Sequence, residues 1–354
     1  MSIRLDKLRA YMDENGLDAV WITGGVNHRY ISGFDNPDGE LVVGAFSAVA
    51  LQDFRYFEAA KKQMNKNDFQ VLMMDRSCTL ADCIAGYYRR VGYEDVTVTC
   101  RRLEQLRKKL PNVEFVPMGD AFLNMRRTKT REEVDCIKAA QRIAERSFRE
   151  LLPKITCSAK ETELAAELEY IMKKNGSEGV AFDTIAVSGK NSALPHGTPR
   201  NACLEKGFLT FDFGAVFNGY RSDMTRTVCI GKADSDMRRL YDTVLRAQSA
   251  ALEAVGPGES CFKMDKIARD IIDGAGYIGA FGHSLGHGVG LEIHESPNLS
   301  PSAGDRRLMP GDIVTVEPGI YLYGKYGCRI EDMVYITESG AENLTLMEKE
   351  LIEI

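Results

Sequence analysis

The segment that most constrains the fold of this chain is 209–228, LTFDFGAVFNGYRSDMTRTV, which has the pattern of a β-hairpin. Asn218-Gly219 is the strongest short signal for a two-residue type I′ turn. In the register set by that turn, Asp212 and Asp223 share one face of the hairpin as diagonal neighbours, about 7–8 Å apart or less. The spacing therefore predicts two carboxylates within reach of a pair of metal ions about 3.5–4 Å apart.

A second hairpin is expected at 314–336, VTVEPGIYLYGKYGCRIEDMVYI, with its loop centred on Gly324. In that register Glu317 and Glu331 lie directly opposite each other. Two like charges so placed destabilise a sheet unless a cation lies between them. A shift of one residue would turn the two side chains to opposite faces, so this pairing depends on the loop length.

One imidazole completes a hard, oxygen-rich donor set. The candidate metal ligands are Asp212, Asp223, His287, Glu317 and Glu331. Four carboxylates carry four negative charges, which two divalent ions neutralise and one does not. Such donors suit Mn, Co, Zn or Fe, and two of these ions can share a bridging hydroxide at neutral pH. We therefore expect a hydrolase of amides or esters with that hydroxide as nucleophile.

The motifs around these residues resemble one family of enzymes. They are FDTIAVSG (182–189), LPHGTP (194–199), FDFGAVFNGYRSDMTRT (211–227), GHSLGHGVGLEIHESP (282–297), VEPGIY (316–321) and RIEDM (329–333). Together they resemble the pita-bread metallopeptidases: Xaa-Pro aminopeptidases, prolidases and methionine aminopeptidases, with creatinase as a metal-free relative. RYISGF (29–34) and QDFRYFEAA (52–60) resemble the N-terminal part of the shorter Xaa-Pro peptidases.

The resemblance implies a role for each metal ligand. Asp212 and Glu331 would bridge two divalent ions, for which we expect Mn, with Co or Zn as alternatives. Asp223 would complete one ion, and His287 with Glu317 the other. Glu317 would also be the general base for the bridging water.

The resemblance also implies roles for residues that do not bind metal. His196 and His294 would hold the substrate and stabilise the tetrahedral oxyanion, and His283 would lie near the substrate. Arg329 would orient a ligand carboxylate through its fixed fork of donors. The fifth histidine, His28, is expected to be a hydrogen-bonded residue in a loop of the N-terminal part.

The resemblance leaves several functions open. Dipeptide-specific prolidases often place an Arg where this chain has Asn298, and a neutral side chain cannot grip a free carboxylate in the same way. We therefore expect an Xaa-Pro aminopeptidase acting on peptides with proline in second position, with a prolidase as the alternative. A methionine aminopeptidase, an organophosphate or ester hydrolase, a non-enzymatic binding module and a creatinase-like amidinohydrolase are further alternatives.

The length of 354 residues suits two domains. Residues 1–125 alternate helix and strand patterns and predict an α/β domain. Residues 126–354 are expected to form an α+β pita-bread catalytic domain. Two helix pairs in it, 132–151 with 163–176 and 236–255 with 263–277, indicate a weak internal duplication.

The composition of the chain indicates which partners and which cellular compartment to expect. A net charge of −6 and a pI near 5.6 give no reason to expect nucleic acid or an anionic membrane as a partner. The N-terminus lacks the apolar core of a signal peptide, and nine dispersed cysteines are typical of free thiols in a reducing cytosol. We expect a cytoplasmic protein, and the resemblance implies a homodimer.

Within the N-terminal part, particular segments are expected to form particular elements. Strands are expected at 18–23, 41–51 and 69–74, and helices at 5–16, 78–92 and 102–110. In the catalytic part, Ser158 with Glu161 predicts a capping box before the helix at 163–176. The glycines of GHSLGHGVG (282–290) predict a loop that runs into a strand.

Overall fold

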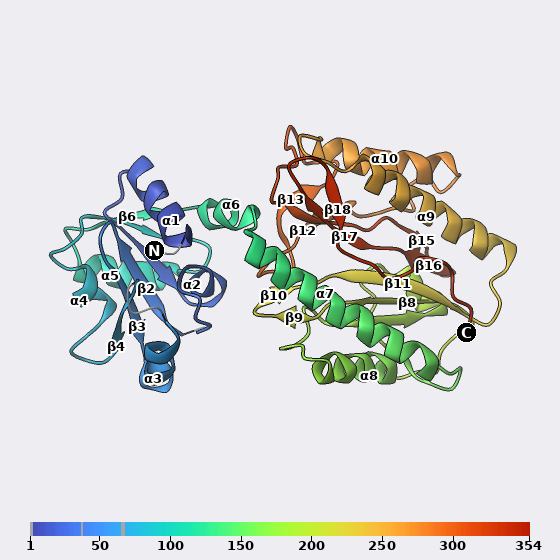
Figure 1. Ribbon diagram of the computed structural model, residues 1–354, viewed down its shortest axis with the longest axis horizontal. Coiled ribbons are helices and arrows are strands. Elements are labelled where there is room, and N and C mark those ends of the chain that lie inside the picture. Colours follow the sequence, from blue (N-terminus) through green and yellow to red (C-terminus); the bar gives the residue numbers. More distant parts are fainter. Residues whose placement is uncertain (1–2, 37, 65–67) are drawn as a thin grey trace. The chain divides into compact units, whose positions relative to one another are not determined.

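The computed structural model describes residues 3–36, 38–64 and 68–354. The chain divides into two compact units, Met1–Arg126 and Arg127–Ile354. Figure 1 shows both units. No helix in the described part of the chain is both long and apolar enough to cross a bilayer.

The N-terminal unit is built on a six-stranded mixed sheet in the order β4-β3-β2-β1-β5-β6. Its strands are β1 (Ala19–Thr23), β2 (Glu40–Gly44), β3 (Ala48–Gln52), β4 (Gln70–Met73), β5 (Arg90–Tyr93) and β6 (Glu114–Pro117). Its helices are α1 (Ile3–Glu14), α2 (Gly25–Ser32), α3 (Phe54–Gln63), α4 (Leu80–Ile84), α5 (Cys100–Lys109) and α6 (Ala121–Arg127), the last of which runs to the first residue of the next unit. Trp21 on β1 is fully buried in the core of this sheet.

Two predicted elements of the N-terminal unit differ from the structure. The segment 41–51, expected as one strand, is a hairpin in which β2 and β3 pair antiparallel. The segment 78–92, expected as one helix, is helical only over α4 and then enters β5, which pairs in parallel with β1. Gly86, with φ of 77°, lies between the two elements and breaks the helix.

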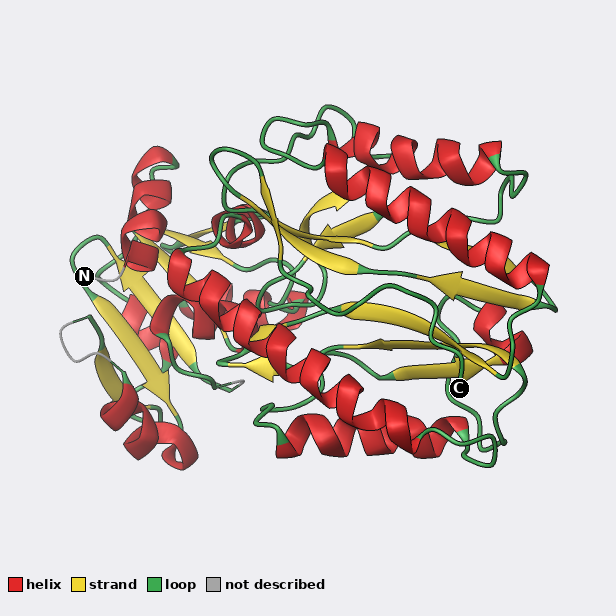
Figure 2. Ribbon diagram, turned by 45° about the vertical axis from the view of Figure 1, so that its right-hand side comes forward, coloured by secondary structure: helices red, strands yellow, loops and turns green. Residues whose placement is uncertain are grey.

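The C-terminal unit has two sheets with helices outside them (Figure 2). The first sheet has the order β11-β8-β7 and the second β13-β12-β14-β17-β18, with the small pairs β9-β10 and β15-β16 beside them. The helices are α7 (Arg131–Leu151), α8 (Glu161–Lys174), α9 (Ser235–Ala254) and α10 (Cys261–Gly274), with short 3-10 turns η1 (Leu152–Lys154) and η2 (Gly189–Ala193). The strands are β7 (Ile185–Ser188), β8 (Gly207–Phe213), β9 (Val216–Phe217), β10 (Tyr220–Arg221), β11 (Met224–Ile230), β12 (Gly286–Gly288), β13 (Glu295–Leu299), β14 (Ile313–Val316), β15 (Gly319–Leu322), β16 (Tyr326–Arg329), β17 (Asp332–Ile336) and β18 (Ala341–Asn343).

Each helix pair covers its own sheet through a separate apolar core. Phe148 of α7 and Leu168 of α8 pack with Phe211 of β8 in one core. Leu240 of α9 and Val314 of β14 belong to the other. This repeated arrangement of two helices over one sheet is what the two predicted helix pairs indicated. The strands are left between the two helix layers, where they can present polar side chains to each other.

Both predicted hairpin registers are confirmed. Asn218 and Gly219 have φ of 48° and 75°, as a type I′ turn requires, and β8 pairs with β11 so that Asp212 lies opposite Thr225. The pairs β15-β16 and β14-β17 continue one register on either side of Glu317 and Glu331.

The predicted capping box of Ser158 and Glu161 is wrong. The Ser158 hydroxyl instead contacts Thr156, and helix α8 begins at Glu161. The Glu161 carboxylate is fully buried and accepts two hydrogen bonds from the Arg200 guanidinium, at 2.7 and 3.0 Å. A buried carboxylate paired with a fork of donors is the stronger interaction, so it displaces the exposed cap.

We predict that Gly214→Ala destabilises the chain through the β8-β11 hairpin. A Cβ at this position would lie 1.9 Å from the backbone oxygen of Ser222, so the two strands would have to separate. Overpacking of this kind costs about 1–3 kcal/mol of unfolding free energy, and Asp212 and Asp223 would move apart. Urea denaturation measures the loss.

Gly256→Ala is the matched control, because no atom lies within 4 Å of a Cβ placed there. Equal stability losses in the two variants would contradict a specific close approach at Gly214.

Candidate metal centre

A cavity of about 580 Å³ lies within the C-terminal unit. Its walls come from segments far apart in the sequence, because each sheet sends strand ends and loops to the same place. The predicted site residues among its lining are His196, Asp212, Asp223, His283, His287, His294, Glu317, Arg329 and Glu331. The structure therefore brings together every site residue that the sequence analysis named.

The carboxylates reach the cavity from the ends of paired strands. Asp212 is on β8 and Asp223 lies just before β11, while Glu317 follows β14 and Glu331 lies between β16 and β17. Ligand atoms of Asp223, His287 and Glu331 all lie within 4.8 Å of one another. This is the close clustering of anionic groups that a cation has to offset.

His287 presents an unprotonated nitrogen to the carboxylates. Its Nδ1 is 3.0 Å from the backbone oxygen of Gly288, which can only accept, so Nδ1 carries the proton. Its Nε2 lies 3.5 Å from Asp223 Oδ2 and 3.3 Å from Glu317 Oε1. Burial lowers the pKa of His287 to about 4, so at neutral pH a nitrogen lone pair faces two carboxylate oxygens. This is the tautomer of a histidine that binds a metal through Nε2.

Asp212 supplies a second indication of a cation. Its Oδ2 accepts a hydrogen bond of 2.5 Å from Arg329 Nη2. Its Oδ1 is buried and has no hydrogen-bond partner in the described part of the chain. A buried carboxylate oxygen without a donor is costly unless an ion binds it. The residues present therefore fit divalent cations with oxygen and imidazole ligands.

The pKa shifts of the cavity carboxyls also indicate a cation site. Burial, and then the charge of Glu331, raises the pKa of Asp223 well above its usual range. Burial, and then the charge of Glu317, does the same for Glu331, and burial raises the pKa of Glu317 to about 8. Burial of several carboxylates in one cavity thus favours their protonated forms, and bound cations would favour the ionised forms.

Arg329 connects the ligand carboxylates to the substrate side of the cavity. Besides Asp212, its guanidinium donates to Thr225 Oγ1 at 2.9 Å and to the Tyr321 hydroxyl at 2.7 Å. Thr225 in turn donates to Glu331 Oε2 at 2.7 Å. One buried guanidinium thus fixes two carboxylates, one directly and one through a hydroxyl.

Tyr321 extends this network to a histidine. His283 Nδ1 donates to the backbone oxygen of Ser284 at 2.9 Å, which leaves Nε2 as an acceptor for the Tyr321 hydroxyl, also at 2.9 Å. The rings of His287 and His294 are in edge contact, with centroids 4.3 Å apart. Burial, and then the neighbouring charge of His196, lowers the pKa of His294.

Sequence reasoning missed three hydroxyl groups, two that hold candidate ligands and one that joins Arg329 to His283. Thr225, Tyr321 and Thr315 were not singled out, although Thr315 Oγ1 donates to Glu317 Oε1 at 3.2 Å. The signal for two of them was present in the strand pattern. Thr225 lies directly opposite Asp212, and Thr315 precedes Glu317 by two residues and so shares its face.

His28 is not among the residues that line this cavity. It is fully buried on helix α2 of the N-terminal unit, where its Nδ1 donates to the oxygen of Phe34 and its Nε2 accepts from Gln52. The prediction of a hydrogen-bonded histidine is confirmed, but the residue lies in a helix and not in a loop. Cys229 on β11 and Cys328 on β16 are fully buried members of the apolar core.

Two family models match the chain. Metallopeptidase family M24 matches residues 135–338, and the creatinase/prolidase N-terminal domain matches residues 4–128. The Xaa-Pro dipeptidase of Pyrococcus furiosus is 39% identical over 99% of this chain and 100% of its own length. The two models match successive parts of the chain, and this relative aligns with nearly all of it.

Solved structures agree with the sequence comparison. An Xaa-Pro dipeptidase from Bacillus anthracis matches with a TM-score of 0.93 and 36% identity over 99% of both chains. An X-Pro aminopeptidase from Thermotoga maritima matches with a TM-score of 0.90 and 35% identity, covering 96% of this chain and 98% of its own. The C-terminal unit thus has the pita-bread fold, and the N-terminal unit is a creatinase-type α/β domain.

We predict that the metal-free protein loses stability as the pH rises from 6.5 to 8. Glu317 has a folded pKa of about 8 against an ordinary value of 4.5, so in this window the folded chain binds more protons than the unfolded chain. The free energy of unfolding therefore falls with rising pH. His287 is lowered from 6.5 to about 4, so its contribution lies at lower pH. Thermal unfolding in a chelator measures the slope.

Two controls accompany this measurement. Saturating Mn²⁺ should weaken the slope, because the bound cation favours the ionised carboxylates, and Glu317→Gln should weaken it in the metal-free protein. A metal-free stability that rises between pH 6.5 and 8 would contradict the buried, proton-holding carboxyls.

We predict that Arg329→Lys lowers metal affinity or turnover by about 10–100-fold, the usual effect of losing a residue that orients a ligand. A point-like ammonium cannot reach Asp212, Thr225 and Tyr321 at once as the guanidinium does. Calorimetric titration with Mn²⁺ measures the affinity.

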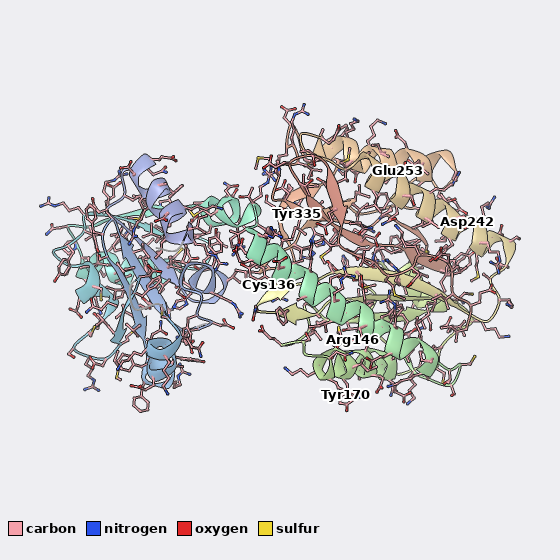
Figure 3. The ribbon with its side chains drawn as sticks, in the orientation of Figure 1. Cys136, Arg146, Tyr170, Asp242, Glu253 and Tyr335 are labelled. Atoms are coloured by element: carbon pink, nitrogen blue, oxygen red, sulfur yellow. The ribbon has the colours of Figure 1, made fainter. Side chains whose placement is uncertain are left out.

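Arg146→Lys is the control. Arg146 is exposed on helix α7 (Figure 3), and its guanidinium donates to the backbone oxygen of Asn175. Unchanged Mn²⁺ affinity and turnover in Arg329→Lys would refute the orienting role of Arg329.

Proposed function

This chain belongs to metallopeptidase family M24, and we propose that it is an Xaa-Pro dipeptidase that hydrolyses the bond before a C-terminal proline. The observation that carries the proposal is the five-residue ligand cluster of the cavity, in a chain that aligns end to end with Xaa-Pro dipeptidases. The sequence alone favoured an aminopeptidase acting on longer peptides. The relatives support its alternative, the dipeptidase, better.

We propose that the cluster holds two divalent ions, with Mn expected before Co or Zn. Asp212 and Glu331 would bridge the ions, Asp223 would complete one, and His287 with Glu317 the other. The buried Oδ1 of Asp212 and the unprotonated Nε2 of His287 support these assignments. Four carboxylates beside one Arg329 also leave more negative charge than a single divalent ion offsets.

Bound divalent ions would supply Lewis-acid chemistry, since they polarise a carbonyl and lower the pKa of water. The protein would supply the proton acceptor. Glu317 lies in contact with His287, and Thr315 donates to its Oε1, which fixes one oxygen and leaves the other available. We propose that Glu317 accepts the proton of the attacking water and passes it to the departing proline nitrogen.

The three cavity histidines that would not bind metal are proposed to face the substrate. His294 and His196 would donate hydrogen bonds to the carbonyl oxygen as it gains charge. The charge of His196 contributes to the lowered pKa of His294, which supports the closeness of the two side chains. His283, held by Ser284 and Tyr321, would position the substrate with its orientation already fixed.

An Xaa-Pro bond suits a site of this kind. Proline forms a tertiary amide without an N–H, so a peptidase that relies on that donor cannot bind it. Carbonyl polarisation needs no such donor. Apolar residues that line the cavity, among them Phe182, Ile185 and Ile293, would contact the pyrrolidine ring.

A specific observation supports a second candidate, the Xaa-Pro aminopeptidase. Asn298 lines the cavity where an Arg would grip a dipeptide carboxylate. Asn298, His283 and Ser284 also line a second, more open groove of about 640 Å³. A peptide longer than two residues would extend from the cavity into this groove.

The compartment is proposed from the cysteines and the assembly from the family resemblance. Nine free cysteines support a reducing compartment such as the cytoplasm. A homodimer is proposed from the family resemblance.

The deciding experiment compares alanyl-proline with alanyl-prolyl-alanine as substrates of the Mn-loaded protein. We expect cleavage of the dipeptide with the larger kcat/KM, and Asp212→Asn as the metal-site control should cleave neither. Faster release of alanine from the tripeptide would replace the proposal by the aminopeptidase. Failure of the wild-type protein to cleave either peptide, with metal bound, would refute both.

A further inference from the structure

The segment 127–130, from the last residue of helix α6 to the residue before α7, carries two cations that pack within the C-terminal unit. The Lys129 backbone N–H donates to the oxygen of Gly311 at 2.9 Å, which fixes the path of the segment. Arg127 and Lys129 then each turn a side chain onto a buried carboxylate of the same unit. The sequence shows this basic segment only as a boundary, and the reaction described above does not use it.

Lys129 forms an ion pair that is closed to solvent on both sides. Its Nζ lies 3.1 Å from Glu295 Oε2, and each of the two side chains is only 1% exposed. The ammonium also donates to the backbone oxygen of Arg127 at 3.1 Å. A pair this deeply buried is held in one geometry, because neither charge can exchange its partner for water.

The carboxylate of Glu295 closes the turn that carries His294. Its Oε1 accepts a hydrogen bond of 3.2 Å from the backbone N–H of Glu292. The residues between the two, Ile293 and His294, both line the cavity. Glu295 also packs against Gly290, where a Cβ would lie 2.4 Å from Oε2. The turn is therefore shaped by the position of one buried carboxylate.

We propose that Lys129 is a positioning residue for His294 and acts through Glu295. The ammonium holds the Glu295 carboxylate, the carboxylate holds the turn 292–295, and the turn holds the imidazole beside His287. The proposal deepens the proposed function and rests on it, because it assigns His294 to the stabilisation of the transition state. Lys129 itself touches neither the substrate nor the proposed metal ligands.

Arg127 supplies a matched comparison within the same segment. Its guanidinium donates to Asp312 Oδ1 and Oδ2, both at 2.8 Å, and Asp312 Oδ2 accepts from the backbone N–H of Met309 at 2.9 Å. As with Lys129, a cation holds a buried carboxylate, and that carboxylate closes a four-residue turn. The turn 309–312, however, contributes no residue to the lining of the cavity.

The test compares Lys129→Met with Arg127→Met in the full-length, Mn-loaded protein. Lys129→Met should lower kcat for alanyl-proline on the order of 100-fold, the cost of a misplacement of about 1 Å at a reacting centre. KM and Mn²⁺ content should change little, since the metal ligands are untouched. Arg127→Met should keep a near-native kcat.

Hydrogen exchange of the backbone gives a readout that needs no substrate. Lys129→Met should speed exchange in residues 290–296, and Arg127→Met in residues 309–312. If the wild-type protein does not cleave the dipeptide, the proposed function fails, but the exchange still decides whether Lys129 holds the turn.

Two double variants distinguish loss of positioning from the cost of an unpaired buried charge. Neither of them leaves a charged side chain at residue 129 or 295. Lys129→Met with Glu295→Gln keeps an oxygen that accepts from Glu292 and should recover part of kcat. Lys129→Met with Glu295→Ala has no group to close the turn and should stay slow. The proposal is overturned by equal kcat in the two double variants, by an equal loss in Arg127→Met, or by native kcat and native exchange in Lys129→Met.

Discussion

The mutual repulsion of buried carboxylates is the constraint on which this structure depends. Burial and then the charge of Glu331 raise the pKa of Asp223, and burial and then the charge of Glu317 raise the pKa of Glu331. A chain gains nothing in stability from such a cluster unless cations complete it. The strands, the turns and the surrounding hydroxyls are therefore best understood as a frame that holds anionic groups together until metal binds.

The strands can hold these groups in place because a strand register can shift only by whole residues. Side chains alternate between faces, so a hairpin that fixes one pair fixes all of them. The turn at Asn218-Gly219 sets the places of Asp212 and Asp223, and the loop around Gly324 sets those of Glu317 and Glu331. The helices outside each sheet then fix the sheets through separate apolar cores, so that two local registers make one site.

The part of the site that could be predicted from the sequence is the part governed by local rules. Turn type, alternation and donor chemistry sufficed for the ligand candidates and for both registers. Contacts between segments far apart in the chain were out of reach. Glu161 was assigned to a helix cap because its partner, Arg200, is distant in sequence, and Tyr321 gained its meaning only when Arg329 and His283 met on its hydroxyl. The strand expected at 41–51 failed differently, because its apolar run continues through a turn that carries no strong signal.

Selectivity for dipeptides over longer peptides depends on how the far end of the substrate is bound. A hydrogen bond to a charged group contributes about 1.5–3 kcal/mol and a neutral one about 0.5–1.5 kcal/mol. Asn298 in place of an Arg therefore changes the affinity for a dipeptide carboxylate by only about tenfold. A closed end to the cavity would exclude longer peptides far more strongly, but Asn298, His283 and Ser284 border a second open groove. Selectivity for dipeptides then has to come from a donor that meets the carboxylate. Without one, the same metal centre would accept peptides of several lengths with similar efficiency.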